Sequence, residues 1–395
     1  MREHSVRRGL HRLAMAALLV CAGCAGASGS PDADAAPSTD TGSRSGAVAG
    51  WQPWTVALST AEASRTCLPT DRLVVCPVAP AGLVARSAST GAVAWSVGAD
   101  RPTGRNAGVA VDGNRALSAG GRTLRAFDLT TGRPAWTKEF PAGRTVGRPA
   151  AADGVVYVAA YGATAAEPQT LFAYRASDGA PLWQHDSTGI VPVAVGSRVY
   201  TVESGARAVA RDGRTGEAVA TSDGSHPCPS LISAPGYLVC ASSPAAAGDI
   251  FPPVVRIDPD TLAFDRTLLQ PVDKPYGGVI TPDGVLVLRT VNAEDPAGGD
   301  WTAIDMESGR ILWETTGMGD DIVLAGSRVV WVSEGRLVSV DPRGGPEATG
   351  TDAPRYSPAY PEAADDRYPN LSAHDDTHLV LQTEARPTLR SVPAP

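Results

Sequence analysis

The chain has 395 residues, a formal net charge of −8, and 42 acidic against 34 basic side chains. Removing residues 1–23, with their four arginines and one glutamate, leaves a chain that is more acidic still. This charge disfavours nucleic acid as a partner, because nucleic-acid binding depends on clustered Lys and Arg. Lysine occurs only as Lys138 and Lys274, whereas Ala, Gly and Pro are abundant, which is typical of a GC-rich bacterial genome.

The N-terminus has the order of an export signal. Four arginines precede an apolar run at residues 13–20, which is too short to span a bilayer core of about 20 residues. The run is followed by Cys21-Ala22-Gly23-Cys24, which resembles the bacterial lipobox. That resemblance implies cleavage after residue 23, acylation of Cys24 and a lipid anchor on the extracytoplasmic face of the cell membrane. An ordinary secretory signal with incidental cysteines is the alternative.

Residues 24–48 are mostly Ala, Ser, Gly, Asp, Pro and Thr, with little that is large and apolar. Such a segment buries too little surface to fold, so we expect a flexible linker. Residues 49–395 exceed the usual length of one domain, which repeat architectures routinely do. The predicted domains are therefore a signal (1–23), an acylated cysteine with its linker (24–48) and a repeat body (49–395).

Two phrases recur along the body. The first places Gly four residues before Trp and follows a short alternating strand; it occurs at residues 90–95, 131–136, 178–183 and 308–313. The second is a polar turn that leads into a short strand, and it occurs eight times, near residues 71, 112, 153, 196, 235, 283, 326 and 375. The spacing of roughly 40 to 50 residues is that of a four-stranded propeller blade. The sequence predicts an all-β, eight-bladed β-propeller.

The last repeat lacks a Gly-to-Trp phrase, and the missing phrase stands at the other end of the chain. Trp54 follows Gly50 by four residues and precedes the turn at Asp71 by the interval that separates Trp95 from Asp112. We therefore predict that residues 51–59 form the outer strand of the blade that residues 370–392 complete. This closure leaves no open sheet end.

The Gly-to-Trp phrase resembles the repeat of the PQQ-like propeller superfamily, which includes quinoprotein alcohol dehydrogenases and the outer-membrane assembly lipoprotein of Gram-negative bacteria. The resemblance covers most of residues 50–392 and implies the fold. It is weak evidence for function, because unrelated functions share a fold. It implies that the tryptophans pack between neighbouring blades: Trp54, Trp95, Trp136, Trp183 and Trp313. Three repeats lack the tryptophan: Ala220 and Arg266 stand in its position in two of them, and the repeat after Asp341 has none. We expect those blades to pack differently.

Four cysteines remain beyond Cys24, two in each of two repeats, and each pair flanks the first turn of its repeat. Antiparallel neighbours come within disulfide range, so we predict the bridges Cys67–Cys76 and Cys228–Cys240, in keeping with an oxidising compartment. Zinc is the competing interpretation, but only His226 lies close to either pair in the sequence.

Chemistry in propellers converges on the central channel, and the segments expected to line it are small and apolar, as at residues 107–111 and 191–195. The adjacent-cysteine pair of the larger quinone-dependent relatives is missing, so we expect no cofactor, PQQ included, and no catalytic residue. The run His374-Asp375-Asp376-Thr377-His378 has metal-ligand residue types but occupies the place of a strand-joining turn, so no metal site is predicted.

The loops that enter the first strands are the candidate binding face at one end of the channel. They carry Arg105, Asn106, Arg148, His226, Tyr276, Asp320, Asp321 and Tyr368. The predicted function is a monomeric cell-envelope lipoprotein that binds or scaffolds another envelope protein, whose identity the sequence leaves open. The alternatives are an extracytoplasmic sensor or carrier of a small ligand or metal, and a degenerate quinoprotein-like oxidoreductase.

Overall fold

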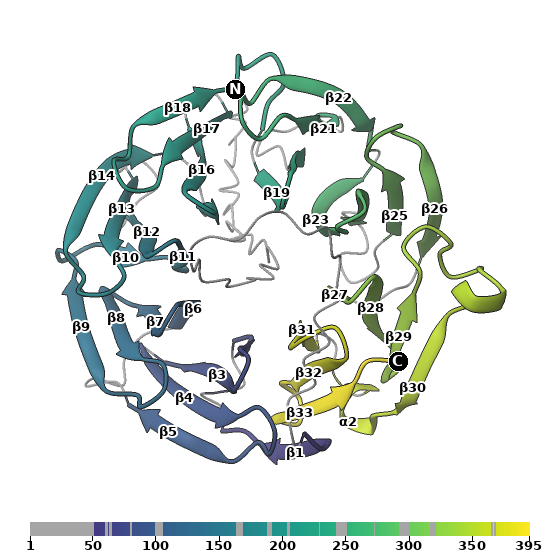
Figure 1. The fold of residues 1–395 in the computed structure, drawn as a ribbon, viewed down its shortest axis with the longest axis horizontal. Helices are drawn as coiled ribbons and strands as arrows, with labels where there is room; N and C mark the ends of the chain where they lie inside the picture. The colour runs from purple at the N-terminus through teal and green to yellow at the C-terminus, as the bar shows by residue number, and fades with distance from the viewer. Residues whose placement is uncertain are drawn as a thin grey trace, which may run out of the picture.

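The computed structural model describes residues 51–395 with gaps at 60–61, 63–64, 80, 99–105, 163–168, 188–191, 204–205, 229, 242–250, 272, 292–299, 317–320, 365 and 367–368. The predicted signal, Cys24 and the linker thus lie outside the described residues. The chain forms eight antiparallel sheets arranged as blades around a central axis (Figure 1). The predicted eight-bladed, all-β propeller is confirmed.

Each blade begins at the channel and ends at the circumference. Blade 1 contains β2 (Leu68–Pro69), β3 (Leu73–Val78), β4 (Gly82–Ser87) and β5 (Val93–Val97). Blade 2 contains β6 (Asn106–Asp112), β7 (Arg115–Gly120), β8 (Thr123–Asp128) and β9 (Pro134–Glu139). Blade 3 contains β10 (Thr145–Val146), β11 (Ala150–Ala152), β12 (Val155–Tyr161), β13 (Gln169–Arg175) and β14 (Pro181–Ser187), with β10 and β11 both pairing with β12. Blade 4 contains β15 (Val193–Val195), β16 (Arg198–Glu203), β17 (Arg207–Asp212) and β18 (Ala218–Thr221).

The second half repeats the arrangement. Blade 5 contains β19 (Ser230–Ala234), β20 (Tyr237–Ala241), β21 (Val254–Ile257) and β22 (Phe264–Leu269). Blade 6 contains β23 (Lys274–Ile280), β24 (Val285–Val291), β25 (Asp300–Asp305) and β26 (Ile311–Thr316). Blade 7 contains β27 (Ile322–Ala325), β28 (Arg328–Ser333), β29 (Arg336–Val340) and β30 (Arg355–Ala359). Blade 8 contains β31 (Asn370–Ala373), β32 (His378–Thr383), β33 (Thr388–Pro393) and β1 (Trp54–Ala57).

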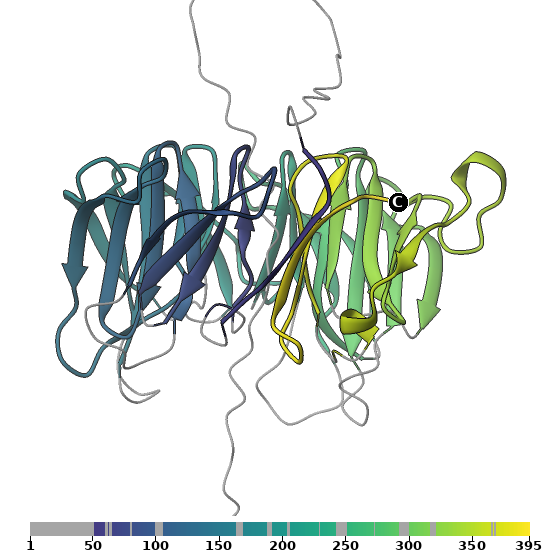
Figure 2. The ribbon, with the colours of Figure 1, turned by 90° about the horizontal axis from the view of Figure 1, so that it is seen from below.

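Blade 8 joins the two ends of the described chain. Strand β1 pairs antiparallel with β33, and Trp54 stands opposite Ser391 in the register. Figures 1 and 2 show this N-terminal strand lying beside the C-terminal one. The indole of Trp51, just before β1, donates a hydrogen bond to Ser391 Oγ at 2.9 Å. The predicted closure of the ring by the N-terminal strand is confirmed.

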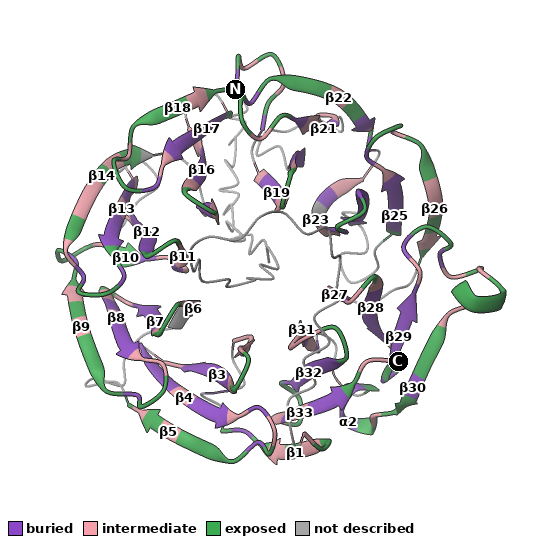
Figure 3. Ribbon diagram, in the orientation of Figure 1, coloured by how far each residue is buried: buried purple, intermediate pink, exposed green. Residues whose placement is uncertain are grey.

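The core lies between the faces of neighbouring sheets, because the middle strands of each blade are covered on both sides. Every residue of β24 is buried. The outer strand β5 is mostly exposed (Figure 3). Each blade thus contributes apolar residues to two cores; one cluster, for example, joins Leu117 and Leu124 of blade 2 to Val156 and Val158 of blade 3.

Helix is scarce in the described part of the chain. A 3-10 turn, η1 (Gly350–Asp352), lies in the connection between β29 and β30, which extends beyond the ring (Figure 2). The short helix α2 (Pro361–Ala364) follows β30. Among the described residues, no helix is long and apolar enough to cross a membrane.

Candidate functional site

The recurring tryptophan and glycine lock one blade onto the next. Each indole from an outer strand lies against a glycine in the last turn of the following blade, where the glycine φ is between +69° and +76°. A Cβ on any of these glycines would lie only 2.5 to 2.7 Å from the ring. The pairs are Trp54 with Gly91, Trp95 with Gly132, Trp136 with Gly179, Trp183 with Gly216, and Trp313 with Gly345. The predicted packing of tryptophan between blades is confirmed, and it explains why glycine is required.

The same five indoles each donate a hydrogen bond to the carbonyl three residues before the glycine. The distances from Nε1 to oxygen are 2.8 to 3.0 Å; the acceptors are Ala88, Leu129, Ala176, Gly213 and Pro342. A buried carbonyl needs a hydrogen-bond donor, so each junction between blades must provide one. The tryptophans are therefore structural residues that hold the disc rigid.

Two junctions satisfy the carbonyl by another route. Between blades 4 and 5 the indole is replaced by Ala220 and the glycine by Leu262, which is 1% exposed and has a φ of +56°. The Pro259 carbonyl there accepts hydrogen bonds from Arg198 Nη1 and the Tyr200 hydroxyl, both at 3.0 Å.

Between blades 5 and 6, where Arg266 stands in the tryptophan slot, Arg256 Nη1 donates to the Met306 carbonyl at 3.1 Å. At Ala220 and Arg266, in two of the three repeats that lack the tryptophan, the blades thus pack differently, as the sequence predicts.

An ion-pair network joins blades 6 and 7. The Arg343 guanidinium lies 2.9 Å from Asp283 Oδ2 and 2.7 Å from Asp305 Oδ2. The hydrogen bond from Arg343, with others from Ser308, holds the pKa of Asp305 well below its ordinary value. Because all three side chains are partly exposed, the network contributes little to the free energy of folding, and its main effect is to orient blade 7 relative to blade 6.

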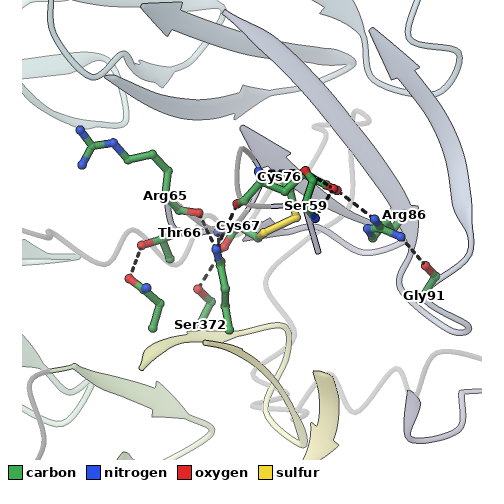
Figure 4. Close-up of a disulfide and its surroundings, with 11 residues drawn as sticks. Ser59, Arg65, Thr66, Cys67, Cys76, Arg86, Gly91 and Ser372 are labelled. Atoms are coloured by element: carbon green, nitrogen blue, oxygen red, sulfur yellow. Dashed lines mark hydrogen bonds and ion pairs between the residues drawn. A yellow bond between two sulfur atoms is a disulfide. The ribbon is translucent and has the colours of Figure 1, made fainter. Parts of the chain in front are cut away.

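A disulfide fixes the crossover from blade 8 to blade 1 (Figure 4). Cys67 is bonded to Cys76, its N–H donates to Gln382 Oε1 at 2.9 Å, and its carbonyl accepts from Ser372 Oγ at 3.1 Å. Gln382 Nε2 donates to the Arg65 carbonyl at 2.8 Å. Buried amides with several partners hold one conformation, so these contacts fasten the ring where the chain closes it.

Glu62 adds a buried ion pair to the same crossover, 2.8 Å from Arg86. Burial raises the pKa of Glu62, but hydrogen bonds from Ser59 and Arg86 outweigh burial and hold that pKa below its ordinary value. The second predicted bridge, Cys228–Cys240, is also present, in blade 5. Both predicted disulfides are therefore confirmed.

Large apolar side chains reach solvent on the outer strands. Among the described residues, four of them lie on the consecutive blades 4 to 7: Val219, Phe264, Ile311 and Tyr356, which are 42% to 62% exposed. We call these four side chains the apolar arc. A fifth, Val93, stands apart on blade 1. Sequence reasoning missed the arc; for two of its members the signal was an apolar residue close to a vacated tryptophan slot, as with Val219 beside Ala220 and Phe264 near Arg266.

The imidazole of His226 packs against a residue of the apolar arc, Phe264. Its ring stacks on Phe264 of β22 with 4.0 Å between centroids and 7° between planes. Ser225 Oγ lies 2.9 Å from His226 Nδ1 and donates to Asp223 at 2.6 Å. The contacts of His226 thus place it at the circumference, where it supports an exposed aromatic ring.

The other predicted binding residues do not form one cluster. The Arg148 side chain packs over Gly108 at the junction of blades 2 and 3, and Asp321 accepts from the Leu371 N–H between blades 7 and 8. Arg105, Asp320 and Tyr368 lie outside the described residues, and the side chains of Asn106 and Tyr276 are not described. The predicted face at the channel end stays a prediction.

The two-histidine run forms the turn between β31 and β32. His378 Nδ1 contacts both carboxylate oxygens of Asp375, at 2.8 and 2.9 Å, while the ring of His374 is centred 6.4 Å from that of His378. Burial lowers the pKa of His374, and the neighbouring His378 lowers it further. No group of three or more His, Cys, Asp or Glu side chains within the described residues is arranged to hold a metal ion.

Comparison with known proteins finds solved structures of similar architecture. A family model described as outer membrane protein assembly factor BamB matches residues 50–226. No curated protein matches the chain. The crystal structure of BamB from Moraxella catarrhalis is 16% identical, with a TM-score of 0.57, over 85% of this chain and 97% of that one.

Two further solved structures share the fold at similar distance. The quinohemoprotein alcohol dehydrogenase from Comamonas testosteroni is 15% identical, with a TM-score of 0.59, over 86% of this chain and 76% of that one. The computationally designed protein Ika8 is 13% identical, with a TM-score of 0.59, over 82% and 94%. At such identity the likeness concerns the fold. The chain is an eight-bladed propeller, similar in architecture to BamB.

Proposed function

We propose that this protein is a cell-envelope lipoprotein whose propeller binds another envelope protein through the apolar arc of blades 4 to 7. The observation that carries the proposal is the position of Val219, Phe264, Ile311 and Tyr356, all exposed and all on consecutive outer strands. Exposed aromatic and branched side chains on a rigid surface are the usual anchors of protein interfaces. The match of residues 50–226 to the BamB family supports a scaffolding role in the envelope.

Site-specific photocrosslinking in the native cells tests the arc. A benzoylphenylalanine introduced at position 264 or 311 should give one discrete adduct with an envelope protein. Val93, which is 53% exposed on the outer strand of blade 1, is the matched control and should give none. Adducts of equal yield at positions 93 and 264 would exclude the arc as the docking surface.

The proposed anchor has its own test, because the arc does not depend on it. Labelled palmitate should be incorporated into the wild-type chain and not into Cys24→Ala, and only the wild type should sediment with membranes. The basis is the small residues that precede Cys24 in the sequence. A Cys24→Ala chain that still carries label would refute acylation at this cysteine.

A further inference from the structure

A cleft of about 470 Å³ lies between blades 4 and 5, away from the apolar arc's side chains. Its walls come from the β15–β16 turn, the β19–β20 turn and the β21–β22 turn, and they include Arg198, Tyr200, Tyr237, Pro259 and Asp260. The volume is within the range of small-ligand sites, roughly 300 to 1,000 Å³. Nothing in the proposed scaffolding role uses this cleft.

One residue in the repeat explains why the cleft is open. At the preceding junction, the Tyr157 hydroxyl fits against Gly213, and a Cβ there would lie only 2.2 Å from the hydroxyl oxygen. Tyr200 occupies the equivalent place in blade 4, as the third residue of its strand. The equivalent of Gly213 is Pro259, whose ring cannot approach a tyrosine so closely. The Tyr200 hydroxyl instead donates a hydrogen bond to the Pro259 carbonyl, at 3.0 Å.

The cleft contains a guanidinium whose carboxylate partner is exposed to solvent. Arg198 Nη1 contacts Asp260 Oδ1 at 2.7 Å and the Pro259 carbonyl at 3.0 Å, so both contacts use the same nitrogen. A guanidinium presents its donors in a fork geometry that matches a carboxylate. The Asp260 side chain is 76% exposed, so a ligand can displace it at low cost.

The remaining walls are suited to an apolar group. Val195, Ala234 and Leu238 line the cleft beside the ring of Tyr237, over which the Arg256 guanidinium lies at 5.3 Å. Asp260 would repel a doubly charged anion, and Arg198 is the sole basic residue in the described lining. This balance favours a single carboxylate over a phosphate.

We propose that the cleft between blades 4 and 5 binds a molecule with one carboxylate and an adjoining aromatic or branched apolar group. Arg198 holds the carboxylate in place of the exposed Asp260 side chain, and the apolar group lies against Tyr237 and Val195. A free amino-acid derivative and the C-terminus of a protein carry the same chemistry, so the test must separate them.

Calorimetric titration of the purified chain with four probes makes this separation. N-acetyl-phenylalanine and the peptide Ala-Ala-Phe should bind, whereas their C-terminal amides should bind roughly tenfold more weakly or worse. A peptide that binds at least tenfold more tightly than the single residue indicates a protein C-terminus as ligand; equal binding indicates a small carboxylate. Amides that bind as well as acids, or no binding by any probe, would overturn the proposal, as would tighter binding of inorganic phosphate.

Three variants distinguish a binding role from a structural one. Asp260→Asn removes the competing carboxylate and should strengthen binding about two- to fivefold, a gain that a merely structural residue would not produce. Ala234→Tyr should fill the cleft and abolish binding.

Arg198→Ala should weaken binding roughly tenfold or more. Arg115, whose guanidinium contacts the Ser177 carbonyl of the next blade, holds the same position in blade 2. Arg115→Ala is therefore its control and should leave affinity unchanged. Unaltered affinity in both Asp260→Asn and Ala234→Tyr would refute the site even if Arg198→Ala fails to fold.

Discussion

Gly179 offers a direct measure of the lock between blades. It has a φ of +71°, and an added Cβ would lie 2.7 Å from Trp136 Cδ2, whereas Gly113 has a φ of +50° and open space around its Cβ position. Gly113→Ala should therefore cost only the backbone strain, about 1 to 2 kcal/mol. Gly179→Ala adds overpacking of about 1 to 3 kcal/mol. Urea unfolding should show Gly179→Ala to be the less stable variant by that added amount.

The junction of blades 4 and 5 shows the natural solution to the same clash, because Ala220 and Leu262 replace the tryptophan and glycine together. Trp136→Ala and Gly179→Leu should each destabilise the protein, and the double variant should lose about 1 to 3 kcal/mol less than the sum. Unfolding free energies from urea titrations, with m-values checked for equality, give the coupling. Additivity within about 0.5 kcal/mol would refute a direct contact between indole and glycine.

Three further outcomes follow from the disulfides and the titrating groups. The loops closed by Cys67–Cys76 and Cys228–Cys240 span 9 and 12 residues, so chain entropy predicts that the bridges stabilise the fold by about 2.6 and 2.8 kcal/mol. Cys67→Ser should nevertheless lower the free energy of urea unfolding more than Cys228→Ser does, because it also loosens the crossover. The reverse order would contradict the role given to Gln382. Burial, with the charge of Asp153, raises the pKa of Asp112, so the folded state loses stability as pH rises from about 4 through the raised pKa. The free energy of unfolding, measured against pH, should lack this loss in Asp112→Asn. Burial lowers the pKa of His374, so stability should fall as pH drops below about 6.5, and His374→Phe should be less acid-sensitive in thermal melts; equal acid sensitivity would refute the assignment.

The fold could be predicted because its rules act over short stretches of sequence. A polar turn followed by an alternating strand, repeated eight times, fixes the number of blades. The interval from Trp54 to Asp71 identifies the closing strand without reference to distant contacts. The cysteine pairs were equally accessible, because each pair spans a single turn between strands that pair with each other.

The surface features depend on contacts between repeats, which no single repeat contains. The cleft arises because Pro259 meets a tyrosine of the preceding blade, so two repeats must be compared in register before it becomes visible. The position of His226 depends on Phe264, which lies 38 residues further on and in a different strand. Exposure at the circumference likewise depends on how each outer strand twists.

The junctions explain how one half of the ring can diverge while the ring stays closed. What recurs at every junction described in detail is a donor for the carbonyl of the following blade, and either an indole or a guanidinium supplies it, as Trp183 and Arg256 show. The bulky ring itself is dispensable. Blades 4 and 5 have used this freedom: the indole is gone from both, the last turn of blade 5 has gained Pro259, and Val219 and Phe264 stand in solvent nearby. A repeat protein tolerates such local change because each blade contacts only its neighbours. Binding features are therefore expected where the tryptophan phrase is broken, and blades 1 to 3, where it is intact, are expected to serve as framework.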